Sequence, residues 1–148
     1  MLNTVKKRLL FLCTGNSCRS QMAEGFTRHH FGDYFDVYSA GTKPKGISIH
    51  AIKAMAELGI DITAQSSKSV EKFISEEFDL VVTLCDDAKE SCPVFPGTTE
   101  IIHLRFEDPA SAVGSDEEIV KIFRKVRDDI QERLLDYLKE KYSIVLDT

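Results

Sequence analysis

A cysteine and an arginine separated by five residues, between an apolar run and a helix-like stretch, constrain this chain more than any other feature. Residues 13–19 read Cys-Thr-Gly-Asn-Ser-Cys-Arg, after the apolar run 9–12 and before the stretch 20–26. A strand, a tight loop and a helix in this order turn a row of backbone N–H groups toward one point, where the helix N-terminus adds partial positive charge. The sequence therefore predicts a cradle for a tetrahedral oxyanion such as phosphate, sulfate or arsenate.

The side chains of this loop have distinct expected roles. Arg19 holds two oxygens of the anion with its forked guanidinium, and the Cys13 sulfur lies beneath the central atom as an activated nucleophile. Asn16 tolerates the left-handed backbone that lets the loop curl, and Ser20 donates a hydrogen bond to the Cys13 thiolate. Ordinary turn and cap chemistry is the alternative for Asn16 and Ser20, and Cys18 is expected to pack as a small apolar residue. The expected oxyanion-binding residues are Thr14, Gly15, Asn16, Ser17, Cys18, Arg19 and Ser20.

Length and charge narrow the range of partners. The 148 residues suit one domain spanning 1–148, and the net charge of −5 argues against nucleic acid or an anionic membrane as the main partner. No apolar run approaches the roughly 18 residues of a membrane span. The short apolar run after the basic residues 6–8 is interpreted as a first strand, not as a signal peptide. We therefore expect a cytoplasmic protein whose cysteines are reduced thiols.

Strand-like runs alternate with helix-like stretches, a pattern typical of βαβ units around a parallel sheet. The expected strands span 8–13, 35–40, 80–84 and 100–104; the expected helices span 20–31, 48–58 (ended by Gly59), 70–75 and a long final stretch after the capping box of Ser115 and Glu118. The tail 142–147 is either a fifth short strand or a docked extension. Because ligands bind at the carboxyl ends of parallel strands, we expect Cys13, Cys85 and the segment 105–109 to converge at one edge of the sheet.

The cysteines do not form a metal-ligand pattern. Four residues separate Cys13 from Cys18 and six separate Cys85 from Cys92, and neither spacing is that of a zinc ribbon. The histidines are scattered, so we expect no metal and no cofactor. If the polar segment between Cys85 and Cys92 is helical, these residues lie about 10 Å apart, whereas a disulfide needs Cα atoms within about 7 Å. Pairing them would require the segment to unwind; alternatively, Cys85 is a buried strand-end cysteine and Cys92 is incidental.

The loop 13–20 resembles the phosphate loop shared by low-molecular-weight protein tyrosine phosphatases and thioredoxin-coupled arsenate reductases. The segments 39–42 (Ser-Ala-Gly-Thr) and 59–62 (Gly-Ile-Asp-Ile) resemble both families, whereas 21–25, 82–93 and 106–110 resemble the reductases. The phosphatases usually carry proline at position 21 and an Asp-Pro-Tyr element near the C-terminus, and this chain has neither. The chain is therefore identified as a member of the reductase branch. The resemblance implies a three-layer α/β fold of low-molecular-weight phosphatase type, in which helices flank a four-stranded parallel sheet.

The resemblance also implies a reaction, the reduction of arsenate to arsenite for arsenic detoxification, with phosphate and sulfate as competing anions. Cys13 attacks arsenic while Asp108 protonates the leaving hydroxide; loop punctuation is the alternative role for Asp108. Cys85 then attacks Cys13 to give a Cys13–Cys85 disulfide. Cys92 moves the bond to Cys85–Cys92, where thioredoxin reduces it. The implied catalytic residues are Cys13, Cys85, Cys92, Arg19 and Asp108.

Several alternatives stay open at this point. A glutaredoxin or another low-molecular-weight thiol is the alternative electron donor. A phosphatase acting on phosphotyrosine is the nearest rival function, and weak phosphatase activity is expected even of a reductase. A non-catalytic oxyanion or redox sensor is the more distant rival. A monomer is expected. Some reductases of this type hold potassium near the loop with an acidic residue, and Lys68 stands at that position here, so we predict no potassium site.

Overall fold

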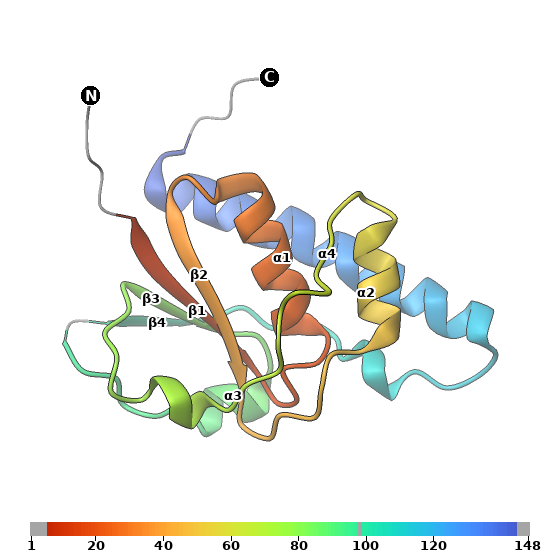
Figure 1. The fold of residues 1–148 in the computed structure, drawn as a ribbon, viewed down its shortest axis with the longest axis horizontal. Coiled ribbons are helices and arrows are strands. Elements are labelled where there is room, and N and C mark those ends of the chain that lie inside the picture. Colours follow the sequence, from red (N-terminus) through yellow and green to blue (C-terminus); the bar gives the residue numbers. More distant parts are fainter. Residues whose placement is uncertain (1–5, 98, 145–148) are drawn as a thin grey trace.

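The computed structural model describes residues 6–97 and 99–144, which form a four-stranded sheet with all strands parallel (Figure 1). Its elements in chain order are β1 (Lys7–Cys13), α1 (Arg19–Phe31), β2 (Phe35–Gly41), α2 (Ile49–Ala56), the 3-10 turn η1 (Val70–Phe73), β3 (Leu80–Thr83), α3 (Asp86–Glu90), β4 (Glu100–His103), the 3-10 turn η2 (Pro109–Ser111) and α4 (Asp116–Tyr142). The strand order is β2-β1-β3-β4. The predicted α/β fold is therefore confirmed.

The central strand β1 explains why the loop after it lies where the other strands end. Residues 9–12 have no exposed surface, because a parallel strand inside a sheet is covered on both faces. Cys13 is in register with Gly41 of β2, and the residue before it pairs with Thr83 of β3. Thr83 pairs in turn with His103 of β4. The four strands thus end at one edge, and the loops that follow them meet there.

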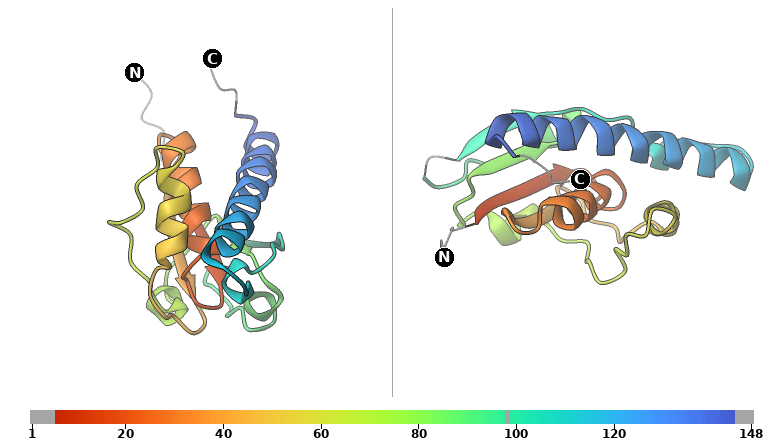
Figure 2. Two further views of the ribbon diagram at one scale, coloured as in Figure 1. Left: turned by 90° about the vertical axis from the view of Figure 1, so that its right-hand side faces the viewer. Right: turned by 90° about the horizontal axis from the view of Figure 1, so that it is seen from above.

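Helices and turns cover both faces of the sheet. The side chains of β2 show which elements cover which face. Phe35 packs its ring against Phe31 of α1 and Tyr142 of α4, whereas Tyr38 packs against Phe73 of η1. Successive side chains of a strand alternate between the faces of a sheet. One outer layer is therefore formed by α1 and α4, which lie side by side in Figure 2, and the other contains η1. This is the predicted three-layer arrangement.

The start of the long helix α4 was predicted correctly from the sequence, whereas the ends of η1 and α2 were not. The hydroxyl of Ser115 accepts from the N–H of Glu118 (3.2 Å), and the N–H of Ser115 donates to Oε1 of Glu118 (3.2 Å), which is the predicted capping box. The stretch 70–75 forms only the short 3-10 turn η1 and not a helix. The helix α2 ends at Ala56, and a turn then brings Gly59 to a φ of +76°.

The tail 142–147, predicted as a fifth strand or a docked extension, lies only in part within the described residues. Tyr142 is the last residue of α4, Ser143 takes a left-handed cap conformation and Ile144 is buried. Tyr142 therefore belongs to a helix and not to a fifth strand, and residues 145–147 lie outside the described part of the chain. Among the helices that the structure describes, none has the length and apolar character needed to cross a membrane.

Candidate active site

The Cys13 sulfur lies at the carboxyl end of β1, where the loop to α1 begins. The residue is 2% exposed, and its Sγ is 2.8 Å from Oγ of Ser20 in the first turn of α1. The end of β2 approaches this loop closely at Gly41. A Cβ atom there would lie 2.5 Å from the carbonyl oxygen of Thr14 and 2.8 Å from the nitrogen of Asn16. Only glycine leaves room for the loop at this position.

Residues 13–17 direct their carbonyl groups to donors outside the loop. The segment after β2 supplies three backbone donors. The N–H of Thr42 donates to the carbonyl of Cys13 (3.2 Å), that of Lys43 to Thr14 (2.8 Å) and that of Lys45 to Gly15 (3.0 Å). The carbonyls of Asn16 and Ser17 accept from Nε2 of Gln21 (3.0 Å) and the N–H of Ser48 (3.1 Å). In a trans peptide unit the C=O and the following N–H point in opposite directions. Each of these bonds therefore turns an N–H group toward the inside of the loop.

The N–H groups turned inward are free to bind a ligand. Among the residues that the structure describes, the N–H groups of 14–19 have no hydrogen-bond acceptor. They surround the N-terminus of α1, whose dipole places partial positive charge at the same point. Free donors around a helix N-terminus are the usual arrangement of an anion-binding loop. The loop is thus able to hold a tetrahedral oxyanion over the Cys13 sulfur.

Asn16 holds the loop in its curled form from inside the protein. Its φ is +46°, in the left-handed region predicted for it from the sequence. Its Nδ2 donates to Oγ of Ser20 (2.8 Å) and Oγ of Ser39 (2.9 Å), and its Oδ1 accepts from the N–H of Lys68 (2.8 Å). Ser39 donates in turn to Oε1 of Glu24 (2.5 Å). Both polar atoms of this fully buried side chain are therefore paired, which stabilises the unusual backbone.

Arg19 and Asp108 meet at the rim of the loop. Nη2 of Arg19 is 3.6 Å from Oδ2 of Asp108, and Nη1 donates to the carbonyl of Phe106 (3.3 Å). The Arg19 side chain is 10% exposed and the Asp108 side chain is 43% exposed, so the cation is fixed inside the protein while the carboxyl reaches solvent. Asp108 also caps η2 by accepting from the N–H of Ala110 (3.0 Å). A carboxyl held beside an arginine at the rim of such a loop is suitably placed to protonate a leaving group.

Cys85 reaches the same loop from the end of the neighbouring strand β3. Its Sγ is 3.4 Å from Oγ1 of Thr14. The Thr14 hydroxyl is also 3.3 Å from Oδ2 of Asp87, which accepts a second hydrogen bond from Oγ1 of Thr42 (2.9 Å). Asp87 therefore ties the first turn of α3 both to the loop and to the end of β2. The predicted convergence of Cys13 and Cys85 at one edge of the sheet is confirmed.

Cys92 lies beyond α3. Cys85 is the N-cap of α3 and Cys92 follows its C-terminal turn, so residues 86–90 of the polar segment between them are helical. Cys92 is half-buried, and this burial raises the pKa of its thiol. Cys18 is buried among the core residues, as predicted, and desolvation raises the pKa of its thiol too. All four cysteines of the chain are free.

Lys68 lies beside the hydrogen-bond network of Asn16. Burial lowers the pKa of its ammonium, the nearby Glu24 opposes this shift, and Nζ donates to the carbonyl of Ser66. Across residues 6–97 and 99–144, no group of three or more His, Cys, Asp or Glu side chains is arranged to hold a metal ion. The absence of a potassium site at Lys68 stays a prediction.

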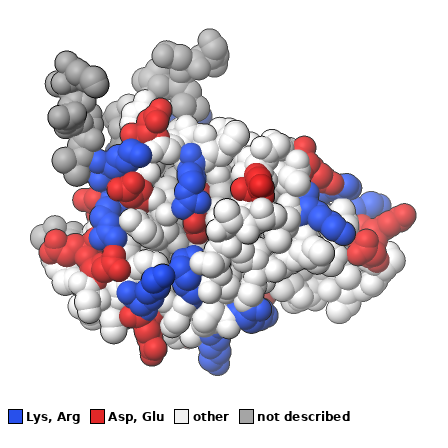
Figure 3. Space-filling view, in the orientation of Figure 1, with Lys and Arg blue, Asp and Glu red and all other residues white. Residues whose placement is uncertain are grey.

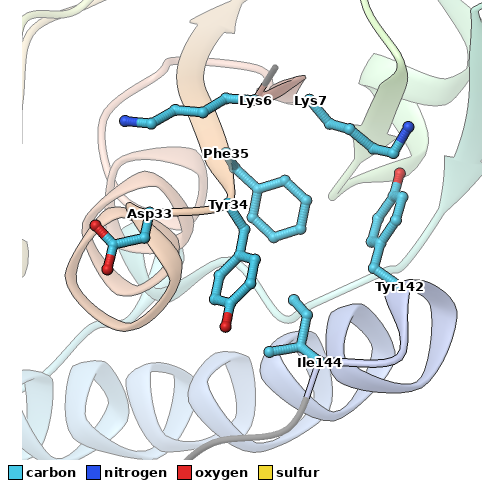
Figure 4. Close-up of a pocket in the computed structure, with 7 residues that line it drawn as sticks. All are labelled: Lys6, Lys7, Asp33, Tyr34, Phe35, Tyr142 and Ile144. Atoms are coloured by element: carbon cyan, nitrogen blue, oxygen red, sulfur yellow. The ribbon is translucent and has the colours of Figure 1, made fainter. Parts of the chain in front are cut away.

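A cavity of about 300 Å³ lies at the opposite end of the sheet from the loop (Figure 4). It is lined by Lys6, Lys7, Asp33, Tyr34, Phe35, Tyr142 and Ile144. Lys7 and Cys13 are the two ends of β1. A strand rises about 3.3 Å per residue, so these ends are roughly 20 Å apart. The cavity therefore takes no part in anion binding at the loop.

Two features of the site were not predicted from the sequence. The segment 42–46 runs beside the loop and accounts for the direction of its carbonyls, and Asp87 joins α3 to Thr14. One signal for the first feature was present in the sequence. The segment follows the carboxyl end of β2, and the ends of parallel strands meet at one edge.

A cysteine beneath a ring of free backbone donors, with an arginine and a carboxyl at the rim, defines the class of cysteine-dependent phosphatase-like proteins. Residues 8–143 match the family described as low molecular weight phosphotyrosine protein phosphatase, and the chain belongs to this family. A solved low molecular weight protein tyrosine phosphatase from T. tengcongensis is 28% identical and has a TM-score of 0.72. That match covers 92% of this chain and 99% of the phosphatase.

Proteins named arsenate reductase are among the similar chains. The one from Halalkalibacterium halodurans is 51% identical over 129 residues, which cover 87% of this chain and 93% of the relative. The one from Bacillus subtilis is 49% identical over 131 residues, which cover 88% and 94% of the two chains. A solved arsenate reductase in a phosphate binding state is 34% identical, with a TM-score of 0.71. The match covers 90% of this chain and 98% of the solved reductase.

Proposed function

We propose that this chain is an arsenate reductase that converts arsenate to arsenite with the thiols of Cys13, Cys85 and Cys92. The observation that carries the proposal is the position of Cys85, whose Sγ lies 3.4 Å from the hydroxyl of Thr14, the residue after Cys13. A phosphatase needs one cysteine at the loop, whereas a two-electron reduction needs a second thiol within reach. Identities of 51% and 49% with proteins named arsenate reductase support this function.

Arsenate binding is assigned to the N–H groups of residues 14–19 together with the guanidinium of Arg19. The backbone donors and the forked guanidinium share the oxygens of the anion between them. Phosphate and sulfate have the same tetrahedral shape and are expected to compete. The chain carries a net charge of −5, so its affinity for anions must arise at this loop and not from a general attraction.

The first chemical step joins sulfur to arsenic. The Cys13 thiolate, stabilised by a hydrogen bond from Ser20, attacks arsenic. The S–As bond forms while one As–O bond breaks. Asp108 donates a proton to the departing hydroxide, which leaves as water. The closeness of Asp108 to Arg19 supports this role, because the anion that Arg19 holds then lies within reach of the carboxyl.

The second step transfers two electrons to arsenic. The Cys85 thiolate attacks Sγ of Cys13, the S–S bond forms and the S–As bond breaks. The electron pair of the S–As bond stays on arsenic, which passes from the pentavalent to the trivalent state and leaves as arsenite. The closeness of Cys85 to the loop, with its Sγ 3.4 Å from Oγ1 of Thr14, supports this step. Two thiols have then become the Cys13–Cys85 disulfide.

The third step regenerates the loop cysteine. Cys92 attacks Cys85, which frees Cys13 and moves the disulfide to Cys85–Cys92. The helix α3 covers only residues 86–90. If the whole segment 85–92 were helical, its two end positions would lie about 10 Å apart, beyond the roughly 7 Å that a disulfide allows. We therefore propose that α3 unwinds in this step. It buries only Ala88 of its own residues, so little apolar packing opposes this change.

Thioredoxin is the proposed reductant of the Cys85–Cys92 disulfide, and a glutaredoxin or a small thiol is the alternative. Such a cycle suits a reducing cytoplasm, where the three cysteines begin as thiols. The proposed acting unit is one chain, because the residues assigned to anion binding and to the first two steps meet at one sheet edge and Cys92 follows in the same chain. No metal and no cofactor is assigned to the reaction.

A low-molecular-weight phosphatase is the second candidate function, favoured by the family match and by the pair of Arg19 and Asp108. Cys13 would attack phosphorus, and Asp108 would protonate the leaving phenolate of phosphotyrosine. This reaction makes no use of Cys85 or Cys92. Weak hydrolysis of phosphate esters is also compatible with the reductase.

The two functions are separated by arsenate-dependent oxidation of NADPH in the presence of thioredoxin and thioredoxin reductase. The reductase predicts steady turnover by the wild type and none by Cys13→Ser or Cys85→Ser. A phosphatase predicts no oxidation of NADPH, with hydrolysis of para-nitrophenyl phosphate that persists in Cys85→Ser and Cys92→Ser. Reversible thiol oxidation with neither activity would indicate a sensor and contradict the proposal.

A further inference from the structure

Two lysines lie on the segment that runs along the outside of the anion-binding loop. Residues 42–46 read Thr-Lys-Pro-Lys-Gly. The N–H of Lys43 donates to the carbonyl of Thr14 (2.8 Å), and the N–H of Lys45 donates to the carbonyl of Gly15 (3.0 Å). The same hydrogen bonds turn the next N–H groups of the loop inward. The backbones of both lysines are therefore fixed relative to the donors that face the anion.

The side chain of Lys45 lies directly against the loop. A Cβ atom on Gly15 would be 2.7 Å from Cε, 3.1 Å from Cγ and 3.3 Å from Cδ of Lys45, so the stem of the lysine fills the space that a side chain at position 15 would occupy. Ser67 stabilises this arrangement, because its hydroxyl accepts from the N–H of Gly46 (3.1 Å) and donates to the carbonyl of Gly15 (3.2 Å). The Lys45 ammonium, one bond beyond Cε, is therefore held near the rim of the loop.

The positive charges of these lysines are not neutralised by neighbours. Both residues are exposed, and neither forms an ion pair with a carboxylate within the described part of the chain. Asp108 faces Arg19 instead, and Asp87 accepts from threonine hydroxyls. Figure 3 shows Lys and Arg side chains along the lower edge of the molecule, where β2 ends in Figure 1, together with an acidic side chain there and with other basic side chains elsewhere on this face. A chain of net charge −5 thus presents a local excess of positive charge beside the loop.

We propose that Lys45, assisted by Lys43, is an outer recognition residue that draws doubly charged tetrahedral oxyanions into the loop. It acts by charge and does not touch the reacting atoms. Coulomb attraction is felt over about one Debye length, roughly 10 Å at 0.1 M ionic strength, which includes the rim of the loop. A concave site lined by one sign of charge raises the local concentration of the opposite ion. The inference rests on the oxyanion site of the proposed function, but its test requires no reduction.

The test is calorimetric titration with inorganic phosphate at about 0.02 M and about 0.5 M ionic strength, where screening is weak and strong respectively. Lys45→Met keeps an unbranched stem against Gly15 and removes the charge, and Lys45→Arg keeps the charge. Lys7→Gln is the matched control, because it removes one exposed positive charge at the other end of β1. At low ionic strength we expect the Kd of Lys45→Met to rise about three- to tenfold, with Lys45→Arg and Lys7→Gln within about twofold of the wild type.

The ionic-strength dependence identifies the cause of the effect. Attraction by charge predicts that the Lys45→Met defect shrinks to less than about twofold at 0.5 M. An equal loss at both ionic strengths would show that packing against Gly15 is responsible and would overturn the inference. Equal affinities of Lys45→Met and Lys7→Gln at low ionic strength would overturn it as well. A wild type that binds phosphate through Lys45 and yet fails to reduce arsenate would refute the proposed function alone.

Discussion

The hydroxyl of Ser20 lies 2.8 Å from the Cys13 sulfur and accepts a hydrogen bond of the same length from the amide of Asn16. Because that amide already donates to the serine oxygen, the serine hydrogen is free to point at the sulfur. The Asn16 amide also donates to Ser39, which donates to the carboxylate of Glu24. A buried polar network thus fixes the groups that surround the nucleophile, and Ser20 acts as donor to the thiolate.

Ser20→Ala is expected to make Cys13 less reactive. A hydrogen bond to a charged group contributes about 1.5–3 kcal/mol, so losing it is expected to slow the reaction of the Cys13 sulfur by about tenfold or more. The measurement is the rate of alkylation of Cys13 by iodoacetamide at neutral pH, followed by peptide mass spectrometry. Alkylation of Cys92 in the same molecules is the internal control. An unchanged Cys13 rate would exclude Ser20 as the donor.

Asp108→Asn is expected to slow the first chemical step and to leave anion binding nearly intact. The amide cannot supply the proton, and a general acid contributes about 10²- to 10⁴-fold. The variant is therefore expected to release arsenite at least about a hundredfold more slowly in a single turnover. Its phosphate Kd is expected to stay within about threefold of the wild type, since Arg19 also keeps its bond to Phe106. A wild-type rate would contradict the role of Asp108 as general acid and leave it only the role of capping η2.

Asp87→Ala and Asp86→Ala form a matched pair at the start of α3. Both remove a carboxylate from the first turn, but only Asp87 contacts the loop, through Thr14. Asp86 is bonded instead to His103 of β4, a contact that lowers the pKa of Asp86. We expect Asp87→Ala to slow formation of the Cys13–Cys85 disulfide by about tenfold, and Asp86→Ala by less than about threefold, as an exposed ion pair is weak. Quenched-flow alkylation measures both rates; equal rates would contradict a positioning role for Asp87.

Features that depend on neighbouring residues were predicted well from the sequence. The continuous apolar run of β1 follows from burial on both faces of a parallel sheet. The capping box of Ser115 and the left-handed Asn16 follow from the local chemistry of those residues. The convergence of Cys13 with Cys85 was predicted because it follows from the topology of a parallel sheet alone.

Individual hydrogen bonds between distant segments were missed, although the convergence of the strand ends was predicted. The bonds from Lys43 and Lys45 to the loop join residues that follow different strands, and no local pattern signals them. The contact of Asp87 with Thr14 spans 73 positions of the chain. The stretch 70–75 was predicted as a short helix, but only residues 70–73 form a 3-10 turn, in which Phe73 packs against Tyr38 of the sheet.

The stability of the fold is expected to depend on the ionisation of Glu57. Hydrogen bonds from Arg124, and then from Arg127 of α4, lower the pKa of this carboxyl from 4.5 to about 2. The unfolded chain therefore binds a proton more readily, and the contribution of Glu57 is present above pH 4.5 and lost as the pH falls toward 2. In urea unfolding, the wild type is expected to exceed Glu57→Gln in midpoint at pH 7 and to approach it at pH 3. A difference that does not change with pH would contradict this account.

The measurement that tests the relay most directly is a single turnover with arsenate and no external reductant. The amount of arsenite is determined, and the disulfides are mapped after alkylation. We predict about one arsenite per chain from the wild type, with a Cys85–Cys92 disulfide, and about one from Cys92→Ser, with the Cys13–Cys85 disulfide trapped. Cys85→Ser is predicted to release none. Arsenite from Cys85→Ser in the amount given by the wild type would contradict the account, because arsenic would then have been reduced without the second thiol.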